Sequence, residues 1–226
     1  MKKYIFIVLV FYSVLAQTQT VLMEEHVDSV YSKTKFGVNS KHFLHSYFSF
    51  GFMFDGKESD VTKFGGTNNL SLGLRYKYRI SNSIATGVEA EYKYSTISFP
   101  THAKIQKDKY HFHEFKYAWY LRLNWGMRGD IMGKFIDLGI YGASLFASNQ
   151  YIKTEGDFKN FQQLTYYQEG LNYIESFNYG FMFRVGINQF VFFSEYRYSD
   201  MLNPDYIDIF RTVPRWTVGL QIGFHR

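Results

Sequence analysis

Strict alternation between apolar and polar side chains constrains this chain more than any other feature. In residues 69–80, NLSLGLRYKYRI, every second residue is leucine, tyrosine or isoleucine, and the positions between carry small residues and three positive charges. Successive side chains of an extended strand point to opposite faces, so the segment predicts a strand with one apolar and one charged face. The fold class depends on which of these faces points inward.

The same alternation recurs in seven further segments, each about as long as a tilted strand that crosses a bilayer. These segments are residues 45–54, 84–95, 114–125, 135–146, 176–187, 189–199 and 215–224. The connections at 81–83, 126–134 and 188–189 are short, whereas those at 55–68, 96–113, 147–172 and 199–214 are long. Short turns at one end and long polar loops at the other are typical of an outer-membrane barrel. We therefore predict an all-β, eight-stranded, antiparallel up-and-down transmembrane barrel with both termini periplasmic.

Composition agrees with a single β domain and excludes several kinds of chemistry. The chain has 226 residues, 21% of them aromatic, and no cysteine, which excludes disulfides, thiolate metal sites and a cysteine nucleophile. A mean hydropathy of -0.25 argues against a polytopic helical membrane protein. The formal charge of +5 comes from basic residues scattered among strands, so no nucleic-acid partner is expected.

The N-terminus has the pattern of a secretory signal peptide. Lys2 and Lys3 precede a short apolar stretch, and Val14 and Ala16 occupy the small-residue positions of a cleavage site. The predicted organisation is a signal peptide at residues 1–16, a periplasmic lead at 17–42 and a barrel at 43–226. A short membrane anchor is the alternative for the first segment.

Glycines and aromatic residues indicate that the apolar faces point outward, toward lipid. Glycine recurs on the charged faces, where it relieves crowding inside a narrow barrel. Aromatic residues on the apolar faces fall near the strand ends, as in the girdles at membrane interfaces. The inward glycines are Gly51, Gly73, Gly87, Gly139, Gly180, Gly186, Gly219 and Gly223. The predicted girdle residues are Tyr76, Tyr78, Tyr92, Tyr94, Trp119, Trp125, Tyr196, Tyr198 and Trp216.

Charges of both signs lie on the inward faces. The short turn at 81–83 predicts that Arg75 faces Glu89 directly, and Arg184 is expected diagonal to Glu195. A buried ion is costly unless paired, so we expect a paired network in the lumen and no open pore. The predicted network consists of Arg75, Lys77, Glu89, Glu91, Glu114, Lys116, Arg122, Asp137, Arg184, Glu195, Arg197 and Arg215.

Two alternatives reverse or replace this fold. A soluble lipocalin-like barrel would place the apolar faces inside, but it needs an early tryptophan after a glycine, and the first tryptophan here is Trp119. A soluble β-sandwich does not require short connections at one end and long connections at the other, so it does not explain the observed loop lengths.

Catalytic and metal-binding patterns are weak. His111, His113 and Glu114 with Ser95 and Ser98 form the only candidate rim site of a lipid A-modifying enzyme, and the spacing lacks the His-x-Ser arrangement of the outer-membrane deacylases. The two histidines could also chelate a metal, but no third ligand accompanies them. No cofactor and no metal are therefore expected. The long segment 158–173 serves either recognition or shielding of the barrel mouth. For the protein as a whole, a small-solute channel is an alternative to a structural role and to an enzyme.

The chain resembles the small eight-stranded outer-membrane β-barrel family, in particular its PorT-like relatives. The resemblance is carried by VLAQ at 14–17, FFSEYRYSDMLNP at 192–204 and WTVGLQIGF at 216–224. The terminal aromatic departs from the family pattern, because Phe224 is followed by His225 and Arg226. The resemblance implies a non-enzymatic structural, adhesive or secretion-accessory role. Its implied partners are outer-membrane lipids and lipopolysaccharide, the barrel-assembly machinery, and a secretion or surface protein.

Overall fold

The computed structural model describes residues 40–54, 67–99, 105–125, 133–154, 164–171, 173–203 and 213–224. All of them belong to one compact unit, Lys35–Arg226. The predicted signal peptide at 1–16, most of the lead at 17–42, most of the turn at 126–134, the loop at 205–211 and the last two residues lie outside the described residues. Among the described residues, no helix is long and apolar enough to cross a membrane.

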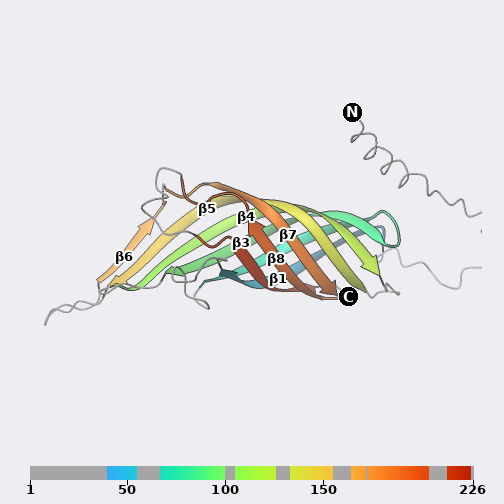
Figure 1. The fold of residues 1–226 in the computed structure, drawn as a ribbon, viewed down its shortest axis with the longest axis horizontal. Coiled ribbons are helices and arrows are strands. Elements are labelled where there is room, and N and C mark those ends of the chain that lie inside the picture. Colours follow the sequence, from blue (N-terminus) through green and yellow to red (C-terminus); the bar gives the residue numbers. More distant parts are fainter. Residues whose placement is uncertain are drawn as a thin grey trace, which may run out of the picture. The chain divides into compact units, whose positions relative to one another are not determined.

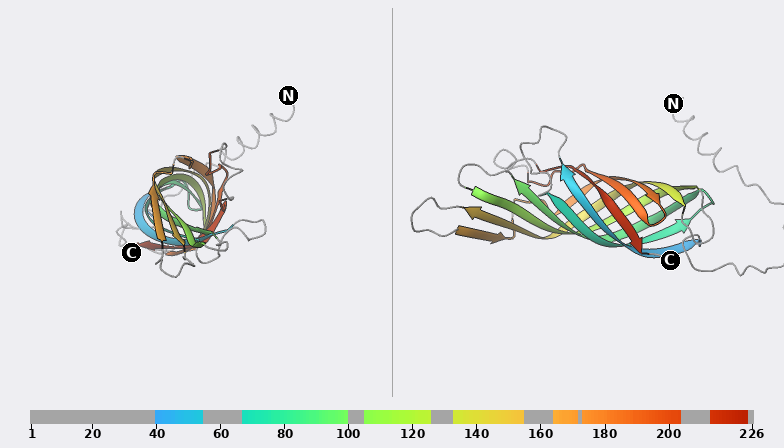
Figure 2. Two further views of the ribbon diagram at one scale, coloured as in Figure 1. Left: turned by 90° about the vertical axis from the view of Figure 1, so that its left-hand side faces the viewer. Right: turned by 90° about the horizontal axis from the view of Figure 1, so that it is seen from below.

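Eight antiparallel strands close into a barrel, as the sequence predicted, and a ninth short strand extends it (Figures 1 and 2). Each barrel strand pairs with its neighbours along the chain, and the first strand pairs with the last. The strands are β1 His42–Phe54, β2 Asn68–Arg79, β3 Ile84–Phe99, β4 Ile105–Trp125, β5 Lys134–Thr154, β6 Leu164–Glu169, β7 Phe177–Ile187, β8 Phe190–Arg197 and β9 Trp216–Phe224. Strand β6 lies outside the ring and pairs with β5.

The apolar faces point outward. Leu72 and Leu220 are 58% and 64% exposed, while Arg75 and Arg122 are 1% and 0% exposed. Such a surface is unstable in water and suits contact with acyl chains, whereas the ions inside are shielded from lipid. The described strands therefore form a transmembrane β-barrel with a polar, filled interior.

The two ends of the barrel differ. One end, here called the turn end, carries the β2–β3 turn, closed by a hydrogen bond from Ile80 N to Ile84 O, and the β7–β8 turn, where Asn188 has a φ of 53°. The described start of β1 and end of β9 lie there too, since His42 pairs with Tyr78 and Phe224 with Ser46. The opposite end, the loop end, carries the longest strands and β6 (Figure 2).

The predicted ends of the strands that flank the connections 96–113 and 147–172 were wrong. Strands β3, β4 and β5 continue into them, and β6 adds a further strand. In residues 109–113 the alternation is reversed: Tyr110 and Phe112 point inward into a buried apolar cluster, whereas Lys109, His111 and His113 lie on the outward face. A register shift at His113/Glu114 leaves Phe146 unpaired between Leu145 and Ala147, so the continuous alternation is also broken at this point.

Large side chains inside the barrel lie against glycines on neighbouring strands. A Cβ atom placed on Gly87 would come within 2.5 Å of the Tyr120 hydroxyl, and one on Gly73 within 2.5 Å of the Tyr47 ring. The cross-strand register makes these contacts specific, because each glycine lies directly opposite its partner. Such opposed pairs are Tyr47–Gly73, Gly87–Tyr120, Tyr141–Gly180, Phe135–Gly186, Met182–Gly139 and Phe193–Gly219. The glycines therefore make space for particular rings and for Met182.

We predict that Gly87→Ala destabilises the barrel by roughly 1–3 kcal/mol, because its Cβ would lie 2.1 Å from the backbone oxygen of Tyr76. The measurement is the urea midpoint of unfolding in detergent micelles, followed by tryptophan fluorescence. Gly142→Ala is the control, since this new methyl would meet only the tip of the Phe177 ring, at 2.9 Å. Equal midpoints for the two variants would contradict the close packing proposed for Gly87.

Candidate functional site

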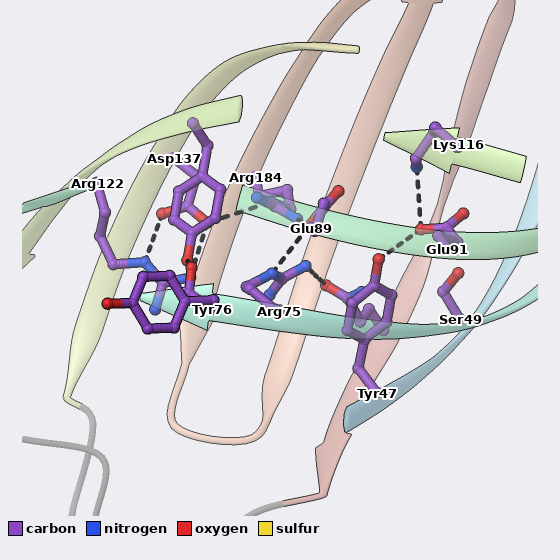
Figure 3. A network of polar contacts seen from close by, with 12 residues as sticks. Tyr47, Ser49, Arg75, Tyr76, Glu89, Glu91, Lys116, Arg122, Asp137 and Arg184 are labelled. Atoms are coloured by element: carbon purple, nitrogen blue, oxygen red, sulfur yellow. Dashed lines mark hydrogen bonds and ion pairs between the residues drawn. The ribbon is translucent and has the colours of Figure 1, made fainter. Parts of the chain in front are cut away.

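The turn-end half of the lumen holds a chain of arginines that share acids (Figure 3). Arg122 donates two hydrogen bonds to Asp137, at 2.6 and 2.8 Å. Arg184 forms ion pairs with Asp137 at 3.1 Å and with Glu89 at 2.5 Å. Arg75 donates to Glu89 at 2.9 Å, from the directly opposed position that the short turn predicts. All five side chains are buried, so each carboxylate compensates two guanidinium groups in a poorly solvated environment.

The loop-end half of the lumen holds a second chain, built on lysines. Lys116 forms ion pairs with Glu91 at 3.0 Å and with Glu195 at 2.5 Å. Glu195 also accepts a hydrogen bond from Lys93 at 3.0 Å. The register places Glu195 diagonal to Arg184, as expected. The two side chains nevertheless bind different partners, because Glu195 pairs with lysines and Arg184 pairs with Glu89 and Asp137.

Tyr47 joins the two chains. Its hydroxyl donates to Glu91 at 2.6 Å, and the Arg75 guanidinium lies 4.6 Å from the centre of its ring. Arg75 also donates to Gln221 of β9 at 2.7 Å. Polar contacts therefore run without interruption from Arg122 near the turn end to Lys93 near the loop end, and they connect strands on every side of the barrel.

Tyr120 occupies the centre of the arginine group. The guanidinium carbons of Arg184, Arg122 and Arg75 lie 4.9, 5.4 and 5.8 Å from its ring centre. Its hydroxyl donates to the backbone oxygen of Tyr76 at 3.2 Å. A π face attracts cations most strongly where water is scarce, so Tyr120 adds stabilisation that no carboxylate supplies.

Four residues of the predicted network lie apart from these carboxylate chains. Lys77 is buried, and its ammonium group lies 5.5 Å from the centre of the Phe43 ring. Glu114 accepts a long hydrogen bond from Asn178, at 3.4 Å. Arg197 donates to the backbone oxygens of Val213 and Pro214, and Arg215 pairs with Asp200 at the partly exposed rim.

Arg215 therefore lies at the loop-end margin of the lumen, where it borders the cavity that Lys93, Glu114 and Arg197 also line. The aromatic prediction needs one correction. Trp119 is opposed to Val88 and Ile140, which places it among the aliphatic residues between the two girdles.

Sequence reasoning missed several members of the network. Lys93 shares a strand face with Glu89 and Glu91, so alternation alone could have included it. Tyr47, Tyr120 and Gln221 carry no formal charge, and only the register brings them to the ions.

The lumen is filled and is covered at the loop end. A cavity of about 10 Å³ lies between Ser49, Glu91 and Gln221, room for about one water molecule. Above it, residues 171, 173–174 and 201–202 cover the mouth with a buried apolar cluster. Its members are Met53, Ile97, Tyr110, Phe112, Leu171, Ile174, Met201 and Leu202. Ile174 and Leu202 form an isolated antiparallel bridge within this cap.

A polar layer borders the cap. Gln150 donates to the Tyr110 hydroxyl at 2.7 Å and accepts from the Tyr173 hydroxyl at 3.2 Å. Burial raises the pKa of Tyr173 above its ordinary value, so this hydroxyl keeps its proton and remains a donor. A cavity of about 40 Å³ below the cap is lined by polar residues that include Lys93, Glu114 and Arg197. These two cavities leave space for a few waters.

The rim histidines are bound to hydroxyl groups. His113 Nδ1 lies 2.7 Å from the Tyr92 hydroxyl, and His111 Nδ1 lies 2.6 Å from that of Tyr94 and 3.2 Å from Thr96 Oγ1. Glu114 points into the lumen, away from both. Among the described residues, no three histidine, aspartate or glutamate side chains are grouped so as to hold a metal ion.

The closed ring, the apolar outer wall and the ionic interior define a small transmembrane β-barrel. One similar solved structure is that of Ail, the attachment invasion locus protein of Yersinia pestis. It shares 12% sequence identity over 81% of this chain and 99% of that one, with a TM-score of 0.40. No protein-family model matches the chain. No curated protein sequence gives a significant match.

We predict that Glu89→Gln destabilises the barrel by about 3–5 kcal/mol, because Arg75 and Arg184 both lose their charged acceptor inside the lumen. Urea titration of the folded protein in detergent micelles measures the change. Asp200→Asn is the matched control, since its pair with Arg215 is half exposed and should contribute less than about 1 kcal/mol. A Glu89 variant no less stable than the Asp200 variant would show that the lumen pairs add nothing.

The packed lumen predicts that the purified barrel conducts no ions. Planar bilayers that contain the refolded protein should show no discrete current steps, whereas a general porin inserted in the same bilayer provides the positive control. Reproducible steps that change in size when Lys116 is replaced by alanine would demonstrate a path through the network.

Proposed function

We propose that this chain is a non-enzymatic outer-membrane protein that uses the sheet beyond its membrane wall to bind another protein. This loop-end sheet consists of residues 105–112 of β4, residues 148–154 of β5, and β6. The observation that supports the proposal is the strand extension itself, because the barrel closes without it and the strands continue well beyond the cap (Figure 2).

Strand β6 forms the free edge of the loop-end sheet. Within the described residues it pairs with β5 alone, so no described strand occupies the hydrogen-bonding groups on its other side. An exposed edge of this kind accepts an extended segment of a partner by strand addition. Tyr166 and Tyr167 are 56% and 54% exposed and lie on opposite faces, next to Ile152 and Tyr151. Large aromatic side chains supply contact area at low entropic cost, which supports a recognition role.

The alternatives have less support. An enzyme would need an acid and a nucleophile near the rim histidines, and the hydrogen-bond partners described for these histidines are tyrosine and threonine hydroxyls. A channel would need a continuous passage, and the described lumen is filled by the ion-pair network. A secretion-accessory role of the PorT-like kind would use the same surface with a different partner.

The test is complementation of a deletion strain with a shortened barrel. Tyr151 and Tyr167 are directly opposed, so replacing residues 152–166 by Asn-Gly joins them with a two-residue hairpin turn. We expect this variant to reach the outer membrane and to migrate as a heat-modifiable barrel. Binding of whole cells to host-cell and protein-coated surfaces should fall to the level of the deletion strain, because the variant loses half of β6, including Tyr166, and the end of β5.

Parallel assays separate the remaining roles. Tyr166→Ala and Tyr167→Ala, tested singly, indicate which face of the sheet contributes. Loss of protein secretion with unchanged surface binding would support the secretion-accessory role. Full complementation by the shortened barrel in every assay would contradict a recognition role for the sheet and leave a structural one.

A further inference from the structure

Three outward-facing histidines each bond a tyrosine hydroxyl through Nδ1. At the loop end the pairs are Tyr92–His113 and Tyr94–His111, and at the turn end the corresponding pair is His42 with Tyr76, at 2.6 Å. A hydroxyl that donates to Nδ1 fixes the neutral ring in the form that carries its proton on Nε2. We assign the tyrosine hydroxyl as the donor in each pair, so that each histidine presents Nε2–H on the opposite edge of its ring.

The two loop-end histidines belong to a donor-rich part of the outer wall. Lys109 follows the same face of β4, and its register partner is Tyr151 of β5. Lys153 lies two positions further along β5, on the same face as Tyr151. Glu169 is the acid on this face of the neighbouring strand β6, opposed to Asn149. Cationic and neutral donors therefore predominate at the level just beyond the aromatic girdle.

A groove lies below these donors on the same strands. It has a volume of about 650 Å³, and its floor includes Ala90 and Gly142, which leave the wall thin at this point. Tyr117 lies between them in register, opposed to Ala90 on one side and to Gly142 on the other. The aromatic rings of Trp119 and Tyr179 border the groove. Between the groove and the histidines, Phe115 and His113 follow Tyr117 on the same face of β4, and both contact the ring of Phe146.

We propose that this surface binds a phosphate-bearing lipid of the surrounding leaflet, with one acyl chain in the groove and the phosphate against His111, His113 and Lys109. The groove opens on the lipid-facing wall, where an acyl chain is the available apolar occupant. The donors above it complement an anionic oxygen group at the depth where lipid headgroups begin. The inference rests on the outer-membrane location proposed above and adds a specific lipid site to it.

The experiment measures lipid retention by the refolded full-length barrel. Native mass spectrometry of protein released from micelles is carried out after incubation with lipid A, which carries two phosphates, and separately with dimyristoylphosphatidylcholine. We expect retention of lipid A and little retention of phosphatidylcholine. The double variant His111→Ala/His113→Ala should retain lipid A about tenfold less well, since it loses two hydrogen bonds to a charged group.

His42→Ala is the matched control, because it removes the same kind of Tyr–His pair at the other end of the barrel. This variant should retain lipid A as the wild type does. Gly142→Leu should fill the groove and reduce retention while the headgroup donors remain, and Ala90→Leu replaces it if the first variant does not fold. Heat-modifiable migration, measured for every variant, distinguishes failure to form the barrel from failure to bind lipid.

Several results would overturn the proposal. Equal retention of lipid A and phosphatidylcholine would show a groove without headgroup selection. Displacement of lipid A by equimolar inorganic phosphate would indicate an anion site that is independent of the acyl chain. Dimers that disappear with Gly142→Leu would assign the groove to a second copy of the chain. Equal loss in the His42 variant would indicate a general effect of the girdles.

Discussion

The narrow interior of an eight-stranded barrel is the constraint on which the rest of this structure depends. Such a wall encloses only enough space for its own side chains, so every inward residue must fit its cross-strand neighbours. Glycine opposite an aromatic ring is one solution, as between Gly73 and Tyr47 or Gly186 and Phe135. The second solution is that two basic residues share one acid. Two guanidinium groups around one carboxylate occupy less space than two separate ion pairs.

The ionic interior compensates for its own desolvation through shared contacts. Asp137, Glu89 and Glu195 each contact two basic groups, and Tyr120 adds its ring to three arginines. Removing one member therefore leaves more than one buried ion without its partner, which makes the network sensitive to single substitutions. The contacts also cross the lumen between non-adjacent strands, as from Arg75 of β2 to Gln221 of β9. They hold the ring closed in addition to the backbone hydrogen bonds.

The features on which the proposed functions rest are concentrated at one end of the barrel. The turn end has short connections, whereas the loop end combines a capped mouth, a sheet edge and two of the three outward histidine pairs. A rigid, filled barrel suits this arrangement, because recognition surfaces on a scaffold that does not deform lose little entropy on binding. The proposed protein-binding edge at β6 and the proposed lipid site on β3–β5 lie on neighbouring strands but use different groups. Their variants can therefore be tested independently.

Much of this fold could be predicted because every second residue of a membrane-spanning strand faces lipid and is therefore apolar. The alternation shows which side of each strand points outward. Leu72 and Arg75, four and seven residues after the start of β2, are assigned to opposite sides by alternation alone. At the loop end the outward side of β4 becomes polar and Tyr110 and Phe112 turn inward into the cap, so the rule that apolar residues face outward no longer applies. For that reason the extensions of β4 and β5, strand β6 and the unpaired Phe146 could not be predicted from periodicity.

By itself the sequence determined the number of barrel strands, the outward apolar face, and the pairing of Arg75 opposite Glu89 across a short turn. Tertiary structure decided which ions meet across the lumen, such as Arg184 with Glu89 and Lys93 with Glu195. These partners are distant along the chain, and their contact depends on the closure and register of the whole ring. Alternation states on which side of the wall a residue lies, and only the closed barrel decides which residues face each other across its interior.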